Sequence, residues 1–155
     1  MAATSTNKQP LLVDHVLHYA VDLSTNFVSG SSISGTNSAA IIVDSTSLDG
    51  AIVEDIYAIS RKAGAYTINL YLSSANDYLR PQEGVFIGTF ESASTAATVT
   101  HWEEMPRCLA PVPQVGDNPY NKALYIPKGR ALWAAVEGTS VDSEAPILGA
   151  QGGWY

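Results

Sequence analysis

The chain has 155 residues, of which 46% are apolar and only 15% are charged, and its formal net charge is −7. A chain of this length is expected to form one domain that buries roughly two-thirds of the surface exposed by its unfolded form. The acidic balance argues against a nucleic-acid partner, because contact with a phosphate backbone needs clustered Lys and Arg. We expect no membrane contact either, since no apolar run approaches the ~20 residues of a membrane-spanning helix. Without a secretory signal pattern at its N-terminus, the protein is expected to be synthesised in a cytoplasm.

The N-terminal part of the sequence begins with small and polar residues. Residues 1–12 are predicted to form an extended, flexible N-terminal arm. Across residues 11–23, apolar side chains recur at every second position, which favours a strand, although Val13, Leu17 and Ala20 would also suit a short helix. The Gly/Ser-rich stretch that follows is too short to link two domains, so residues 13–155 are expected to form a single domain.

Short strand-like runs separated by turn residues occupy the rest of the chain. They cover residues 39–43, 51–60, 65–73, 84–92, 97–105, 122–127, 130–136 and 146–155. The apolar alternation breaks between Val53 and Ile56, where a β-bulge would bring both side chains to one face. The run 65–73 is the clearest strand with one buried face. Evenly spaced short strands without a secure helix predict an all-β domain, a two-sheet sandwich of jelly-roll type.

The two runs within residues 122–136 are expected to form a β-hairpin that turns at residues 127–130. The second of these strands is apolar on both faces, because Trp133 alternates with Leu132 and Ala134. One face must pack in the core of the sandwich. The other face is expected to meet either a second sheet or a sister subunit, since a strand face that is exposed to solvent does not need apolar side chains.

The sequence motifs of enzymes are mostly missing, and we expect no catalytic activity. Neither a Gly-x-Ser-x-Gly elbow nor a dinucleotide-binding glycine pattern occurs. His101 with Glu103 is the best combination for a metal ion or for acid–base chemistry, because both side chains would share one face of a strand. A solvated polar rim at a strand end explains the same residues, and no third ligand lies nearby in the sequence. We therefore predict no catalytic residue, no metal and no cofactor.

Partner contacts are expected from segments that cannot be buried in a sheet on their own. The arm is one of these, and the loop 106–121, which holds four of the eight prolines, is another. Tryptophan and tyrosine rings could stack on sugar rings, but core or subunit contact is favoured for them. The predicted contact residues are Gln9, Pro10, Leu11, Leu12, Pro111, Pro113 and Trp133.

Three segments follow one another in an order that resembles a family of small virion proteins of tailed bacteriophages and prophages. These segments are GAIVEDIYAISRKAGAYTINLYLS (50–73), YIPKGRALWAAV (125–136) and ILGAQGGWY (147–155). The family pattern has a Gly-led strand, a short turn, a strand of "vLrLfl" type, an "lPaGy.L.as" hairpin and a terminal "A.GGdY". The matching residues are Gly50, Ile56, Ala63, Leu70, Leu72, Pro127, Gly129, Leu132, Ala150, Gly152, Gly153 and Tyr155. Trp154 departs from the acidic residue that usually precedes the last Tyr.

The resemblance implies a non-enzymatic, all-β virion component. It implies a head decoration, or cement, protein that binds the major capsid protein lattice at the capsid surface, often as a homotrimer. The arm would then lie along the sheet edge of a neighbour as an added strand. The alternative is a tail or fibre module that binds a host surface glycan, and an unrelated β-sandwich binding module also remains open.

Overall fold

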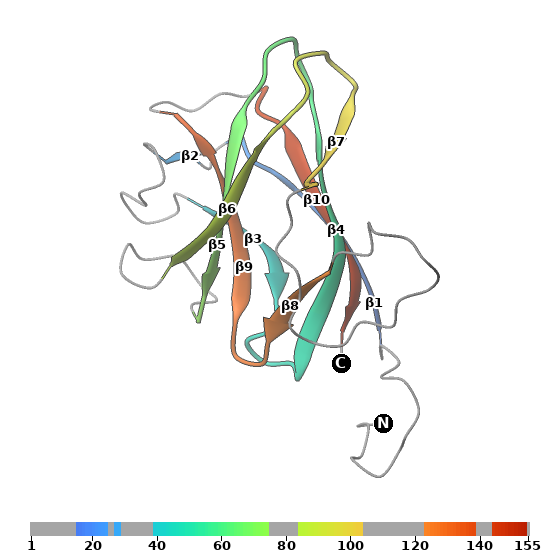
Figure 1. The fold of residues 1–155 in the computed structure, drawn as a ribbon, viewed down its shortest axis with the longest axis vertical. Coiled ribbons are helices and arrows are strands. Elements are labelled where there is room, and N and C mark those ends of the chain that lie inside the picture. Colours follow the sequence, from blue (N-terminus) through green and yellow to red (C-terminus); the bar gives the residue numbers. More distant parts are fainter. Residues whose placement is uncertain are drawn as a thin grey trace.

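The protein is a two-layer β structure. The computed structural model describes residues 15–24, 27–28, 39–74, 84–103, 123–138 and 144–154. Within these ranges the chain forms ten strands and no helix, so they hold no helix that could cross a membrane. The strands build two sheets that pack face to face, which confirms the all-β, two-sheet prediction (Figure 1). The predicted arm, residues 1–12, and the predicted loop 106–121 lie outside the described residues.

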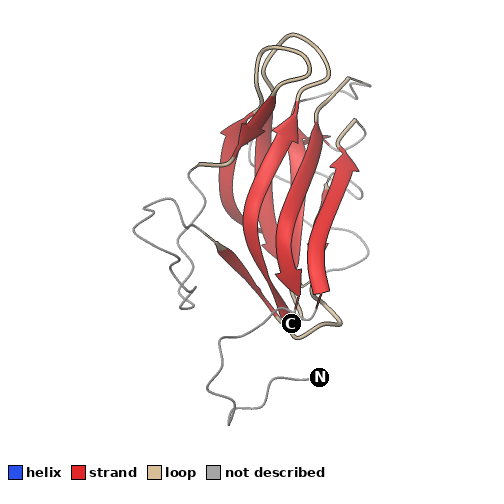
Figure 2. Cartoon of the chain, turned by 90° about the vertical axis from the view of Figure 1, so that its right-hand side faces the viewer, coloured by secondary structure: helices blue, strands red, loops and turns tan. Residues whose placement is uncertain are grey.

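The first sheet, sheet A, contains β4 (Gly50–Ile59), the longest described strand. The strand β10 (Ile147–Trp154) lies between β1 (His15–Asp22) and β4. The far edge of β4 pairs with β8 (Leu124–Pro127) along one half and with β7 (Val99–His101) along the other. Turned by 90°, the molecule shows the strands of this sheet side by side (Figure 2).

The second sheet, sheet B, is centred on β9 (Ala131–Glu137). One edge of β9 pairs with β5 (Thr67–Ser73), which in turn pairs with β6 (Val85–Glu91). The other edge pairs with β3 (Ala40–Asp44) and, in parallel, with the two residues of β2 (Phe27–Val28). Every other strand pair in the two sheets is antiparallel.

The strand pairs are nested along the chain. The first strand pairs with the last, β3 pairs with β9, β4 pairs with β8 and β7, and β5 pairs with β6. Successive pairs alternate between sheet A and sheet B. The described strands therefore form a series of nested antiparallel pairs, and each pair lies in the opposite sheet from the pair before it.

The predicted hairpin within residues 122–136 is wrong. The strand β8 pairs with β4 in sheet A, whereas β9 pairs with β5 and β3 in sheet B. Between them, the N–H of Arg130 donates to the carbonyl of Pro127 at 3.1 Å, and Gly129 has φ of 75°. This turn carries the chain from one sheet to the other. Turn residues mark a chain reversal, but they do not say which partner the next strand finds.

The register between β4 and β10 confirms the predicted β-bulge. In β10 the neighbours Gln151 and Gly152 pair with Asp55 and Val53, so Glu54 is the extra residue in β4. As a result Val53 and Ile56 point to the same side, and both side chains are fully buried.

The strands β9 and β5 are buried on both faces. Leu132, Ala134 and Val136 pack in the core between the sheets, while Ala131, Trp133 and Ala135 form a second cluster with Tyr71 on the outer face of sheet B. The apolar two-faced strand is thus confirmed. The prediction that residues 65–73 bury one face only is wrong, because β5 lies between β9 and β6 and its outer face joins this second cluster.

Candidate binding surfaces

Most of the predicted contact residues cannot be placed. Those outside the described residues are Gln9, Pro10, Leu11, Leu12, Pro111 and Pro113. Trp133 lies in the outer cluster of sheet B with 2% of its surface exposed, and its Nε1 has no hydrogen-bond partner within the described part of the chain. Its contact with a partner stays a prediction, since the isolated chain buries the ring within its own fold.

His101 and Glu103 do not share one strand face, contrary to the prediction from the sequence, because Glu103 lies beyond the end of the strand. The strand β7 ends at His101, and the side chain of Trp102 is buried in the core, while the backbone N–H of Trp102 donates to the carbonyl of Ile56 at 2.8 Å. The partner of His101 is instead Asp55, whose Oδ2 lies 2.9 Å from the imidazole Nδ1. Among the described residues, no three His, Cys, Asp or Glu side chains gather closely enough to hold a metal ion.

The strand β1 has one long and regular edge that pairs with no described strand, and we call it the β1 edge. One side of residues 15–22 pairs with β10 without a register shift, and no described strand pairs with the other side. The other long edge strands, β3 and β6, both have shifted registers, and β7 and β8 have only three and four residues. Bulges, short strands, Lys and Pro all protect sheet edges, and β1 has none of them. Within the described part of the chain, the β1 edge is thus the long strand edge that lacks these protections.

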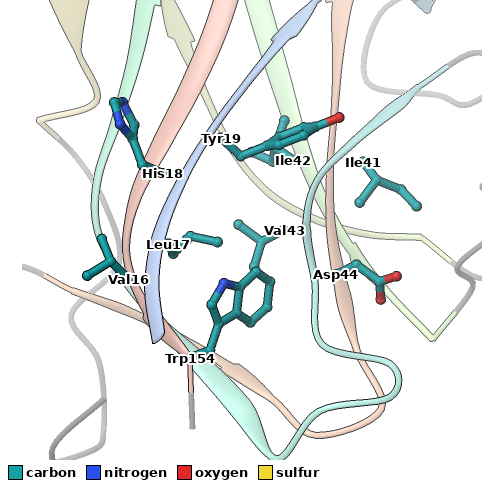
Figure 3. Close-up of a pocket in the computed structure, with 9 residues that line it drawn as sticks. All are labelled: Val16, Leu17, His18, Tyr19, Ile41, Ile42, Val43, Asp44 and Trp154. Carbon is teal, nitrogen blue, oxygen red and sulfur yellow. The ribbon is translucent and has the colours of Figure 1, made fainter. Parts of the chain in front are cut away.

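An apolar cavity of about 450 Å³ opens between β1 and β3, at the margin of the sandwich. Leu17 and Tyr19 point from β1 toward β3, and the ring of Trp154 lies below Val43 (Figure 3). Tyr19 is 51% exposed although it faces the interior side of the sheet. Val16, which points away from this gap, is 81% exposed. Among the described residues, the β1 edge thus combines backbone groups that have no strand partner with apolar side chains and a hollow beside them.

A row of polar and aromatic side chains crosses the outer face of sheet A, and we call it the tyrosine band. It comprises His18 on β1, Gln151 on β10, Asp55 and Tyr57 on β4, and His101 on β7. Cross-strand pairing brings them together: His18, Gln151 and Asp55 are in one register row, and Tyr57 and His101 are in the next. Residues paired in this way face the same side of a sheet.

The side chains of the tyrosine band contact one another. The Nε2 of His18 lies 3.0 Å from the Tyr57 hydroxyl, and the Nε2 of Gln151 donates to Asp55 at 3.2 Å. The imidazoles of His18 and His101 flank the Tyr57 ring, with centroid distances of 6.5 and 6.2 Å and tilts of 50° and 48°.

Sequence reasoning missed most of this band. Asp55, Tyr57 and Gln151 were not singled out, although Asp55 and Tyr57 alternate with the buried Ile56 and Ala58 in the sequence. That alternation alone identifies an outward-facing pair. It does not identify the neighbours, because the strands that bring His18 and Gln151 beside them are distant in the chain.

Next to His101, a second hollow of about 420 Å³ lies between β6 and β7. Its lining includes Thr89, Glu91, Thr100 and Glu103, together with His101 itself. It offers hydroxyl and carboxylate groups, of which the two carboxylates are those of Glu91 and Glu103. Because His101 belongs to both features, the tyrosine band and this hollow are continuous.

One ion pair fixes the end of β1. The guanidinium of Arg61 donates to the carboxylate of Asp22 and to the carbonyl of Ala145, the latter at 2.7 Å. Burial raises the pKa of Asp22, but hydrogen bonds from Ser24 and Arg61 and the charge of Arg61 outweigh that effect and hold the pKa below its usual 3.8. The ionised carboxylate is therefore the form that the fold favours.

Comparison with known proteins finds no relative from which a function of these surfaces could be inferred. No protein-family model, no curated protein and no solved structure matches the chain.

Proposed function

We propose that the protein is a non-enzymatic structural component of a bacteriophage virion. Its role would be that of a decoration, or cement, protein that binds the major capsid protein lattice and stabilises the head. The observation that carries this proposal is the β1 edge, a long regular strand edge with exposed apolar side chains beside an apolar cavity. Such an edge is a template for a strand from another protein.

The strand order supports a jelly-roll sandwich. Nested pairs that alternate between two sheets, with the order β1-β10-β4-β7 in one and β3-β9-β5-β6 in the other, are what a rolled antiparallel ribbon produces. Domains of this type occur in viral capsids and in lectins. The fold is thus compatible both with capsid decoration and with glycan binding.

Docking at the β1 edge would work by strand addition. An extended segment of the major capsid protein would pair with the unpaired backbone groups of β1, and its alternate apolar side chains would enter the cavity between Leu17 and Val43. The backbone pairing supplies affinity, and the cavity selects which side chains fit. The N-terminal arm, residues 1–12, is proposed to make the reciprocal contact with a neighbour, and the chain is proposed to act as a homotrimer on the capsid surface.

The test uses capsids assembled without this protein. Light scattering should give the mass of a trimer for the purified protein, and added protein should saturate the capsids and protect them against heat, because a ligand stabilises the state that it binds. A monomer that does not bind the capsids would contradict the proposal.

One observation favours a second function, the binding of a host surface glycan by a tail or fibre module. The tyrosine band presents an aromatic ring among hydrogen-bonding side chains on an open sheet face. Aromatic rings with a polar edge suit ligands that are apolar on one side and polar on the other.

A further inference from the structure

We infer that the tyrosine band, together with the hollow between β6 and β7, is a binding site for a neutral oligosaccharide. The inference names a site and a ligand class for the glycan-binding function and rests on that second function. The two proposed sites share His18, which lines the cavity beside the β1 edge as well, but the other members of the band lie on β10, β4 and β7 and do not line that cavity.

The ring of Tyr57 forms the floor of the site. In β10 the residue opposite it is Gly149, and the Cζ, Cε2 and hydroxyl of Tyr57 occupy the space that a Cβ of Gly149 would need. The ring therefore leans over the glycine toward β1, where the hydroxyl meets His18. With its hydroxyl held at one end, the ring is fixed across the sheet, and the weakly polar C–H groups of a pyranose can stack on it.

Hydrogen-bonding groups surround this floor. His18 and His101 stand on opposite sides of the ring, and Asp55 accepts hydrogen bonds from Gln151 and from His101 when its Nδ1 is protonated. The carboxylate of Asp55 and the amide of Gln151 are planar groups with several acceptor or donor positions each, and their mutual hydrogen bond already orients them. Neighbouring hydroxyls of a sugar could bind to the positions that these contacts leave open.

The extent of the site indicates more than one sugar ring. From β1 to β7 the band crosses three strand spacings, about 14 Å in total. At His101 it continues into the hollow of about 420 Å³, where Thr89 and Thr100 add hydroxyl groups. A chain of sugars could thus stack on Tyr57 and extend past His101 toward β6.

The charge of the site selects against acidic sugars. Asp55 lies in the band, and Glu91 and Glu103 line the hollow. The whole chain carries a net charge of −7, which repels anionic ligands as well. Neutral hexoses and N-acetylhexosamines are therefore the expected ligands, and uronic or sialic acids are not.

The test is a titration of the full-length protein with neutral oligosaccharides of glucose, galactose and N-acetylglucosamine, followed by NMR chemical shifts and calorimetry. The Tyr57→Ala variant is compared with Tyr125→Ala, a matched control. Tyr125 is 37% exposed on the same face of sheet A, opposite Ile52, which precedes Tyr57 by five residues in β4. A stacked ring is worth about 1.4 kcal/mol, so we expect Tyr57→Ala to weaken binding about tenfold and Tyr125→Ala to leave it unchanged.

Three results would overturn the inference: no saturable binding of any neutral oligosaccharide, equal loss in both tyrosine variants, or tighter binding of an oligouronic acid. Asp55→Asn provides a second test that keeps the side-chain size, and it should weaken binding of neutral sugars without unfolding the protein. Capsid binding is measured separately on the same variants. Tyr57→Ala should retain it, so failure of the sugar site and failure of the capsid proposal can be told apart.

Discussion

Tyr57 and Gly149 are paired across β4 and β10, and the end of the tyrosine ring fills the space that any side chain at position 149 would need. Gly149→Ala should therefore displace the ring from His18. The atoms in the way belong to the far end of a side chain that can rotate, so the free energy of unfolding should fall by less than about 1 kcal/mol. Denaturant unfolding checks the stability, and the NMR signals of His18 report the lost contact.

Gly152 provides the contrasting case on the same strand. It lies beside the bulge at Glu54, and a Cβ at this position would collide with the backbone carbonyl of Ile52. Because a backbone atom in a paired strand cannot move aside easily, Gly152→Ala should lower the free energy of unfolding by about 1–3 kcal/mol. Equal effects of Gly149→Ala and Gly152→Ala in the same denaturation experiment would contradict this explanation.

Trp133 tests whether the outer cluster of sheet B stabilises the isolated chain. The side chain is buried against Tyr71, Ala131 and Ala135. Trp133→Ala should therefore cost about 3–5 kcal/mol of unfolding free energy in the purified protein, measured by urea denaturation. Trp133→Phe keeps much of the packing and removes the unpartnered Nε1, so its cost should be clearly smaller. A small effect of Trp133→Ala would mean that the ring contributes mainly to contact with a partner.

Asp22 predicts a pH dependence of stability. Its pKa is lower in the folded protein than the ordinary 3.8, so its ion pair with Arg61 contributes fully above 3.8 and is lost as the pH falls through the folded pKa. Both side chains are partly exposed, at 50% and 30%, which limits the effect of Asp22→Asn to about 1 kcal/mol or less at neutral pH. Urea denaturation of both proteins well below pH 3.8 should show no difference.

The exposed pair between Asp49 and Lys128 is the control for that experiment. Its side chains are 61% and 69% exposed, so solvent and salt screen it more strongly. Asp49→Asn should change stability less than Asp22→Asn does. If the two substitutions have the same effect at every pH, the specific role of Arg61 is contradicted.

The positions of the strands could be predicted from the sequence, although the burial of both faces of β5 could not. The alternation in residues 65–73 located β5, the apolar run within 130–136 located β9, and the broken period between Val53 and Ile56 located the bulge. These signals are local, since side chains alternate between the two faces of any strand.

The partners of each strand could not be predicted. The turn at residues 127–130 looked like that of a hairpin, but it is a corner between the sheets, because β8 pairs with β4, a strand far away in the sequence. The candidate sugar site shows the same limit. Gln151 and Asp55 are 96 residues apart in the chain, and His18 and Tyr57 are 39 apart, so only the folded sheet brings them together.

The central claim is that the β1 edge docks on a capsid, and cosedimentation with capsids assembled without this protein tests it most directly. The variant is Tyr19→Lys, which places a charge beside the apolar cavity of this edge. The matched control is Val85→Lys on β6, an edge strand of the other sheet, where the side chain is 61% exposed. Both positions are exposed enough for both variants to fold.

We predict that the wild-type protein and Val85→Lys saturate the capsids with the same stoichiometry, whereas Tyr19→Lys binds at least about tenfold more weakly, because the contact would lose the tyrosine ring and would have to remove a charged group from water. Equal binding of all three proteins, or no binding of the wild-type protein, would contradict the account.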